Sequence, residues 1–262
     1  MVLPSGACDS HIHVIGPFSR YPLQVARTPL PPEAAWDRYQ REACAAGLER
    51  AVIVQPSFFG TDNRCTLDAV ARAPGAARAV VVVDPGISRQ ALEALHAQGA
   101  RGVRFNIFSG GLGFAELAPV ADRIRDLGWH IQIFTDSELL PDLADRLLSL
   151  DIDIVFDHMA HTRRMDGVDG KGFRLLLELV QTERFWVKLS NALFPASSER
   201  ARLLIGDKAR HVLWGSDWPH VIYEDEAKGL KALLTDLAGW ADDLVKLKTI
   251  LVDNPDQLYF RD

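Results

Sequence analysis

Two histidines near the start of the chain and an aspartate near its end have the residue types and spacing for hydrolytic chemistry. His11 and His13 close an apolar segment, 7–14, with the composition of a strand, and Asp217 follows a second apolar run, 211–215. Successive side chains of a strand point to opposite faces, so both imidazoles point the same way. Two imidazoles and a carboxylate can hold a metal ion, or can activate water and polarise a carbonyl group. The carboxylate lies about two hundred residues from the histidines, so the fold must bring its two ends together.

Short β-rich runs alternate with helical patterns along the whole sequence. The expected strands are 7–14, 50–55, 78–83, 101–106, 129–135, 152–157, 185–190 and 211–215. The expected helices are 33–46, 65–72, 88–98, 114–127, 138–149, 170–182, 198–206, 226–239 and 242–252. Parallel neighbours need crossover connections, so eight such units predict one (β/α)₈ barrel domain over residues 1–262. A doubly wound open sheet is the alternative, but it usually has a Gly-rich phosphate-binding turn after its first strand.

Polar residues recur at the ends of the expected strands, on the face of a barrel where active sites lie. They are His11, His13, Ser57, Arg104, Asn106, Gln132, Asp157, His158, Lys188, Ser190, Asn191, Ser216 and Asp217. A single histidine at a strand end is more often structural than catalytic, but His11, His13 and Asp217 together favour a functional site. Arg104 and Asn106 are two apart and share a face, and the forked donors of an arginine suit a substrate anion.

Two further residues next to this face receive structural interpretations. Asp9 is expected on the face of His11 and His13, one layer deeper, where its carboxylate would orient an imidazole. We expect His130 and Gln132 to face opposite ways, with His130 turned toward the helices and outside the site.

Composition excludes several classes of partner. The formal net charge is −6, from 29 Lys and Arg against 35 Asp and Glu, without a basic run, so we expect no nucleic-acid partner. The longest strongly apolar stretch, 79–83, is far shorter than the roughly 18 residues of a membrane span, and we expect neither a membrane partner nor a signal peptide. Cys8, Cys44 and Cys65 lack metal-ligand spacing, which is typical of reduced thiols in a cytoplasmic protein. A small-molecule substrate is expected, and a homo-oligomer stays an open alternative.

At this level of detail the chain resembles the amidohydrolase superfamily, most closely the branch of 2-pyrone-4,6-dicarboxylate lactonase and the sugar lactonases. The matching segments are 8–13 (CDSHIH), 55–63 (QPSFFGTDN), 101–106 (RGVRFN), 157–159 (DHM), 214–220 (WGSDWPH) and the tail 253–259, which begins DNP and ends LY. They follow one another from one terminus to the other, so the resemblance covers the whole chain.

The resemblance implies that His11, His13, His158 and Asp217 surround the reacting centre. Many relatives hold one or two divalent ions there with a further ligand from strand four or five, where this chain has Gln132, a poor zinc ligand. The lactonase branch includes enzymes that work without metal, and we therefore expect no required cofactor. The alternative is one divalent cation, most simply Zn²⁺, held by His11, His13, His158 and Asp217.

The implied reaction is hydrolysis of a lactone. Asp217 would take a proton from the attacking water, while His11, His13 and His158 stabilise the oxyanion. The expected substrate-binding residues are Arg104, Asn106, Ser57, Asn191, His161 and His220. The pyrone dicarboxylate enzyme of the family grips two carboxylates with several arginines, of which this chain retains Arg104. A lactone with one carboxylate, or a hydroxyl-rich sugar lactone, is therefore expected.

Three other functions remain open on the same residues. A metal-dependent decarboxylase of an aromatic acid would bind zinc tightly and release carbon dioxide. A lactone isomerase would use the same base to move an acyl group between hydroxyls of a sugar acid. A non-catalytic small-molecule-binding barrel is disfavoured, because all four inner polar residues are retained.

Overall fold

Eight parallel strands form a nearly closed barrel in the computed structural model, which describes residues 1–107, 113–160, 168–190, 197–221 and 228–261. They are β1 (Cys8–Ile12), β2 (Arg50–Val54), β3 (Ala77–Val81), β4 (Ala100–Asn106), β5 (His130–Phe134), β6 (Ile154–Phe156), β7 (Phe185–Leu189) and β8 (Val212–Trp214). Each strand pairs in parallel with the next one along the chain. The (β/α)₈ barrel predicted from the alternation of strands and helices is confirmed.

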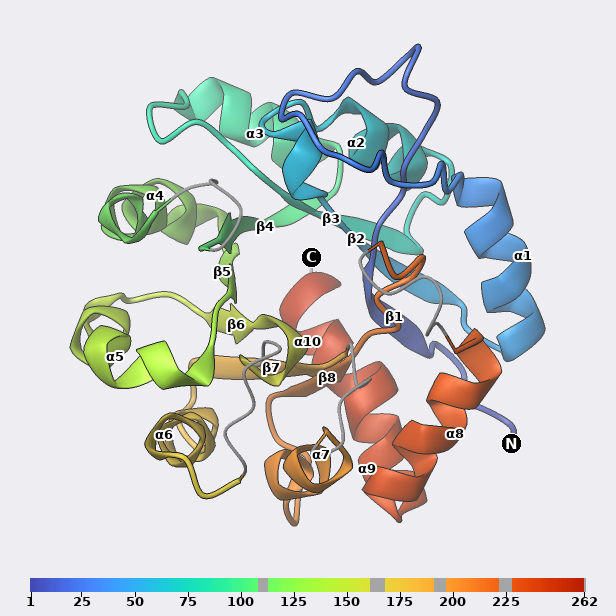
Figure 1. Cartoon of the computed structure of the whole chain (residues 1–262), viewed down its shortest axis with the longest axis vertical. Coiled ribbons are helices and arrows are strands. Elements are labelled where there is room, and N and C mark those ends of the chain that lie inside the picture. The colour runs from blue at the N-terminus through green and yellow to red at the C-terminus, as the bar shows by residue number, and fades with distance from the viewer. Residues whose placement is uncertain (108–112, 161–167, 191–196, 222–227, 262) are drawn as a thin grey trace.

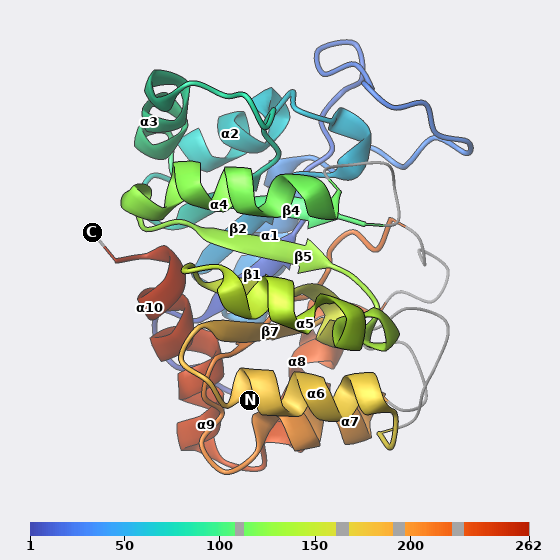
Figure 2. The same ribbon diagram turned by 90° about the vertical axis from the view of Figure 1, so that its left-hand side faces the viewer.

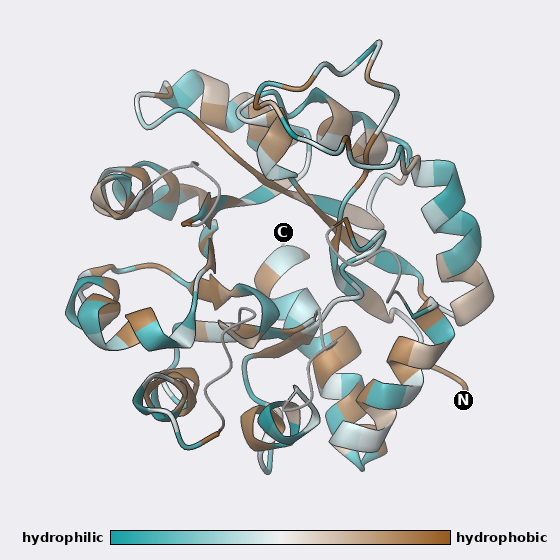
Figure 3. Ribbon diagram, viewed as in Figure 1, coloured by the Kyte–Doolittle hydropathy of each residue, from teal (hydrophilic) through white to brown (hydrophobic). Residues whose placement is uncertain are grey.

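Helices surround the strands in the ring seen in Figure 1. They are α1 (Trp36–Ala46), α2 (Arg64–Ala71), α3 (Arg89–Ala97), α4 (Leu117–Ile124), α5 (Leu140–Ser149), α6 (Lys171–Val180), α7 (Ser197–Ile205), α8 (Leu230–Ala241), α9 (Leu244–Lys248) and α10 (Asn254–Tyr259). The hydropathy colours of Figure 3 show hydrophilic and hydrophobic residues on the same surrounding helices, the amphipathic pattern of helices packed on a sheet. Within the described residues, no helix has both the length and the apolar character needed to cross a membrane.

The C-terminal helices differ most from the prediction. The helix expected over 226–239 begins instead at Leu230, after the extended Gly229, and ends at Ala241 because Asp242 takes a left-handed conformation, with φ 52°. The helix expected over 242–252 begins after Asp243, whose carboxylate caps α9, and passes through the π-helical turn Thr249–Asp253 into α10. A left-handed residue and a cap, which the periodicity did not resolve, thus set these boundaries.

The barrel interior has a small apolar core of its own, separate from the core between strands and helices. It contains Cys8, Val52, Val54, Val80, Val155, Trp186, Leu213, Leu258 and Tyr259. The last two belong to α10, which lies across the barrel opening in Figure 1. In Figure 2 the arrowhead of β5 points away from α10 and toward the end where the loop after β1 projects. The apolar core therefore fills the barrel at the N-terminal ends of the strands, and the polar residues lie at the C-terminal ends.

The first and last strands meet at a seam held by few contacts. The backbone N–H of Asp217 donates to the carbonyl of His11 at 2.9 Å, and the N–H of His13 donates to the carbonyl of Trp218 at 2.8 Å. Gly215 permits this approach, because a Cβ atom on it would lie 2.4 Å from Cβ of His11. The seam therefore fixes the backbone of the histidines against that of the aspartate.

Gly215→Ala should push the seam apart. Overpacking of this kind costs about 1–3 kcal/mol of the free energy of unfolding, and urea denaturation should show a lower midpoint with an unchanged slope. Gly239→Ala is the matched control, since Gly239 lies in α8 with nothing within 4 Å of its added Cβ. That variant should be neutral or stabilised by up to about 1 kcal/mol. An unchanged midpoint for Gly215→Ala would contradict this account of the seam.

Candidate active site

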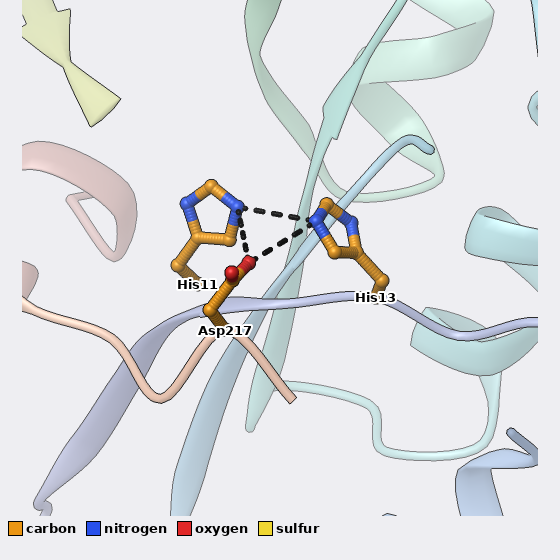
Figure 4. A group of neighbouring side chains, drawn as sticks. All are labelled: His11, His13 and Asp217. Atoms are coloured by element: carbon orange, nitrogen blue, oxygen red, sulfur yellow. Dashed lines mark hydrogen bonds and ion pairs between the residues drawn. The ribbon is translucent and has the colours of Figure 1, made fainter. Parts of the chain in front are cut away.

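His11, His13 and Asp217 converge as the sequence predicted (Figure 4). Oδ1 of Asp217 lies 3.6 Å from Nε2 of His11 and 3.4 Å from Nε2 of His13, and the two Nε2 atoms are 3.4 Å apart. His11 is fully buried, while the side chain of Asp217 is 13% exposed. The three groups thus surround one point that a small molecule can reach from the strand ends.

An irregularity in β1 turns the imidazole of His11 inward. The register of β1 against β2 shifts between Asp9 and Ile12, so the simple alternation of faces fails there. The prediction that Asp9 orients an imidazole is wrong. Its carboxylate instead accepts hydrogen bonds from the backbone N–H of Ser216 at 2.8 Å and of His11 at 3.3 Å, and from the Tyr39 hydroxyl at 3.2 Å. Asp9 therefore ties the two backbones of the seam together, and burial raises the pKa of its carboxyl group to about 6.

His158 reaches the same centre from a left-handed turn directly after β6. His158, Met159 and Ala160 have φ values of 53°, 58° and 45°, a region that costs non-glycine residues about 1–2 kcal/mol each. The buried Arg200 guanidinium donates to the carbonyl of Met159 at 3.2 Å and helps to hold the turn. Nε2 of His158 then lies 4.0 Å from Oδ1 of Asp217. Strain of this kind is common at functional sites, where the surrounding structure fixes an otherwise unfavourable backbone.

Asp157 is a central residue to which the sequence analysis gave no role. Its Oδ1 lies 3.1 Å from Nδ1 of His11, and its Oδ2 accepts a hydrogen bond from Nε of Arg104 at 3.2 Å. The carboxylate is fully buried and burial raises its pKa, yet its interactions with His11, Arg104 and Lys188 outweigh burial and hold its pKa well below the usual range. Asp157 is thus a fixed negative charge beneath the imidazoles.

Lys188 of β7 lies deeper in the barrel and was likewise noted only as polar. Its ammonium donates to Oε1 of Gln132 at 2.6 Å, and Nζ lies 3.5 Å from Nδ1 of His11 and 3.9 Å from Oδ1 of Asp157. Burial lowers the pKa of Lys188 to about 8, against the attraction of Asp157.

The prediction that His130 faces the helices is wrong, since residues two apart, such as His130 and Gln132, share a face. Its ring lies 5.2 Å from that of Tyr259, beneath Gln132 inside the barrel.

Electrostatics keep Asp217 ionised and two imidazoles neutral. Burial opposes the charge on Asp217, but His158, His11 and a hydrogen bond with His13 more than compensate and lower the pKa of its carboxyl group below the usual value. Burial lowers the pKa of His11 well below its ordinary value, and that of His158 below it. At neutral pH the site therefore presents a carboxylate base beside uncharged imidazoles.

The donor set of the site fits a metal ion. Nδ1 of His13 lies 2.8 Å from the carbonyl oxygen of Val54. A carbonyl only accepts, so Nδ1 of His13 carries a proton and its Nε2 faces Asp217. Nδ1 of His11 lies 3.1 Å from Oδ1 of Asp157. Imidazoles anchored through their second nitrogen are the usual metal-ligand arrangement, and His11, His13 and Asp217 are close enough to share one ion.

A cavity of about 360 Å³ opens above these groups. Among the described residues its wall includes His13, Ser57, Arg104, Asn106, His158 and Asp217 from the prediction, together with Val25, Ala26, Arg27, Pro56, Phe58, Phe134 and Val221. The amide of Asn106 donates to the hydroxyl of Ser57 at 2.6 Å. His220 is buried near Asp217 without being part of this described wall. Asn191 and His161 lie outside the described residues.

Comparison with known proteins agrees with this geometry. A family model described as amidohydrolase matches residues 8–261. The chain belongs to the amidohydrolase family. This amidohydrolase is similar to the 4-sulfomuconolactone hydrolase of Hydrogenophaga intermedia, with 34% identity over 275 residues, which cover 98% of this chain and 90% of the relative. The resemblance inferred from the ordered motifs is thereby confirmed.

Two further proteins match over most of their length. The 2-pyrone-4,6-dicarboxylate hydrolase of Comamonas testosteroni is 34% identical over 278 residues, which cover 98% of this amidohydrolase and 91% of the relative. A crystal structure of an apo protein from Agrobacterium tumefaciens matches with a TM-score of 0.89 and 28% identity, covering 100% of this chain and 98% of the other.

Lys188→Met tests the buried charge network. Removing one partner of a buried ion pair leaves the other charge uncompensated, at a cost of about 3–5 kcal/mol, and here Arg104 still contacts Asp157 and reduces that cost. We expect a loss of about 2 kcal/mol or more in the free energy of unfolding from urea titration.

Two controls complete this measurement. Lys231→Met removes a lysine from the exposed side of α8 and should change stability by less than about 0.5 kcal/mol. The double variant Lys188→Met, Gln132→Leu removes the orphaned acceptor as well and should recover part of the loss. A Lys188→Met protein as stable as the wild type would refute the charge network.

Proposed function

We propose that this amidohydrolase hydrolyses a lactone, with Asp217 as the general base. The observation that carries the proposal is the convergence of an ionised carboxylate and three imidazoles beside a cavity of small-molecule size, which Asp217, His13 and His158 line. Relatives named as lactone hydrolases support the same reaction. Carboxylate and imidazoles come from β1 and from the segments after β6 and β8, so they face one another across the barrel mouth.

The proposed reaction follows from the roles that these groups can take. Asp217 accepts a proton from water as the water oxygen attacks the lactone carbonyl carbon. His11, His13 and His158 surround the proposed position of the carbonyl oxygen and polarise it. His158 can donate a hydrogen bond from Nε2 to the oxyanion as it forms, because its Nδ1 can accept one from the Ser190 hydroxyl at 2.8 Å, whereas His11 and His13 donate through Nε2 only when they carry a second proton. When the intermediate collapses, the bond to the ring oxygen breaks and Asp217 returns its proton to the leaving alkoxide. The product is a hydroxy acid, which ionises and releases one net proton.

We further propose that this reaction needs no metal ion. Gln132 stands where many relatives have a further metal ligand, but its oxygen accepts a hydrogen bond from Lys188. The ammonium of Lys188 also places a positive charge 3.5 Å from Nδ1 of His11. A cyclic ester already has a competent leaving group, so hydrogen bonds suffice to polarise its carbonyl. The alternative is one Zn²⁺ held by His11, His13, His158 and Asp217, which would supply Lewis-acid polarisation.

The substrate that we propose is a carboxylated lactone or a sugar-acid lactone. Arg104, Asn106 and Ser57 give the described wall of the cavity one guanidinium, one amide and one hydroxyl, which suit such a molecule. Asn191, His161 and His220 remain in the proposal as further substrate-binding residues.

Proton release in a weakly buffered indicator assay tests reaction and metal requirement together. Purified protein is mixed with a panel of carboxylated butenolides and sugar lactones, with and without a strong chelator. We expect acid release that survives chelation. Activity lost to the chelator and restored by Zn²⁺ would assign the ion to the histidines and Asp217 instead. Silence across the panel would contradict lactone hydrolysis and leave isomerisation and decarboxylation to be followed by product analysis.

Asp217→Asn should abolish most of the turnover while leaving the fold intact. An amide cannot accept the proton of water, and loss of a general base reduces kcat by about 100- to 10,000-fold. Asp207→Asn, at an exposed position after α7, is the matched control and should keep wild-type kinetics. Steady-state kinetics and circular dichroism of both variants provide the comparison. Wild-type turnover by a folded Asp217→Asn protein would refute the role of this residue.

A further inference from the structure

The charges at the cavity floor largely cancel. Arg104 lines the cavity, but its Nε donates to Asp157 at 3.2 Å and its Nη1 donates to the carbonyl of Gln55 at 3.4 Å. Its side chain is only 6% exposed. Lys188, the other cation near this network, lies deeper and is fully buried. Because these two cations face the carboxylates of Asp157 and Asp217, the floor has no excess positive charge for a substrate anion.

A different arginine stands on the outer wall of the same cavity. Arg27 belongs to the loop after β1, which projects beyond the C-terminal ends of the strands (Figure 2). Its guanidinium carbon lies 5.9 Å from the ring centroid of Phe58, within the range of a cation–π contact. The side chain is half-buried, and no ion pair joins it to a carboxylate of the described residues. Arg27 thus places on the cavity wall a positive charge that no carboxylate of the described residues pairs with.

The surroundings of Arg27 are apolar. Val25 and Ala26 of the same loop, Phe58, and Val221 after β8 line the cavity together with Arg27. An arginine held against an aromatic ring in such a setting loses little freedom when it binds an anion, because its planar fork is already oriented. An apolar neighbourhood also strengthens the charge-assisted hydrogen bonds that the guanidinium can make to a carboxylate or sulfonate.

We infer that Arg27 is a specificity-determining residue that binds the anionic substituent of the substrate at the cavity mouth while the lactone ring lies at Asp217. The inference rests on the proposed lactone hydrolysis, and it adds which side of the cavity binds the anionic substituent of the substrate. The fitting substrate is a lactone whose carboxylate or sulfonate is carried on a short apolar arm, pointing outward from the ring carbonyl. Arg104 then serves chiefly to hold Asp157 beneath His11.

Steady-state kinetics with a charged lactone and its neutral analogue test this assignment. The probes are a butenolide with a carboxymethyl group at C4 and the corresponding primary amide, which has the same ring and nearly the same size. For Arg27→Met we expect KM for the acid to rise about tenfold to hundredfold, the range of a lost charge-assisted hydrogen bond. Its kcat should change less than about threefold, because the contact is equal in ground and transition states. The amide should be hydrolysed alike by both proteins.

Two variants control for indirect effects. Arg27→Lys keeps the charge without the fork and should restore part of the preference for the acid. Arg20→Met removes an arginine of the same loop that pairs with Asp68 outside this cavity, and it should leave both probes unaffected. An equal rise of KM for acid and amide in Arg27→Met would overturn the inference, since it would indicate a disturbed loop. An unchanged KM for the acid would overturn it as well.

Calorimetric titration in the Asp217→Asn background separates this inference from the proposed reaction. If the wild type hydrolyses neither probe but the acid binds more tightly than the amide, and only when Arg27 is present, then lactone hydrolysis fails and the anion subsite stands. If the probes are hydrolysed but binding of the acid does not depend on Arg27, the subsite fails and the reaction stands. Absence of both turnover and charge-selective binding overturns both.

Discussion

Hydrogen bonds between β1 and the segment that follows β8 close the barrel, and these same bonds bring the groups of the candidate site together. The N–H of Asp217 donates to the carbonyl of His11, and the N–H of His13 donates to the carbonyl of Trp218, so the two backbones are hydrogen-bonded to each other at the site. Asp9 adds a buried carboxylate that binds both backbones. Because the side chains start from backbone positions fixed in this way, their separations of 3.4–3.6 Å need no further adjustment.

Beneath the seam the polar groups form two layers above an apolar floor. Tyr259 and the other apolar residues of the interior core fill the N-terminal end of the barrel, Lys188 and Gln132 form a middle layer, and Asp157 lies directly under the imidazoles. Buried charges are costly unless they are paired and hydrogen-bonded. Here the cost is offset by mutual contacts, and the result is an environment whose dipoles are already oriented before a substrate arrives, as electrostatic catalysis requires.

Periodicity and spacing were sufficient for the barrel and for the central triad of residues. Eight alternations of strand and helix allow few topologies, and parallel strands bring their C-terminal ends to one face whatever the details. The roles of Asp9, Asp157 and Lys188 needed information that a single sequence does not contain. Asp9 faces away from the site because of an irregularity in β1, which breaks the alternation of faces on which its assignment relied.

Asp157 and Lys188 acquire their roles from the register of β4 to β7, since that register decides which side chains of different strands share a level. Arg27 lies in a loop without periodicity, and its relation to Phe58 arises only when the loop after β1 covers the strand ends. The assignment of His130 could have been avoided from the sequence, because its spacing of two from Gln132 already implied a common face.

The seam also affects the order in which the protein folds during synthesis. Its two sides are separated by about two hundred residues, so the chain must close its largest loop before Asp217 meets the histidines. A ribosome that has completed β1 to β7 has made His11, His13 and His158 but not Asp217. The nascent protein therefore lacks the carboxylate of the candidate site until the last strand inserts, and the four groups come together only with barrel closure. Proteolytic loss of the final strand unit would likewise remove this carboxylate.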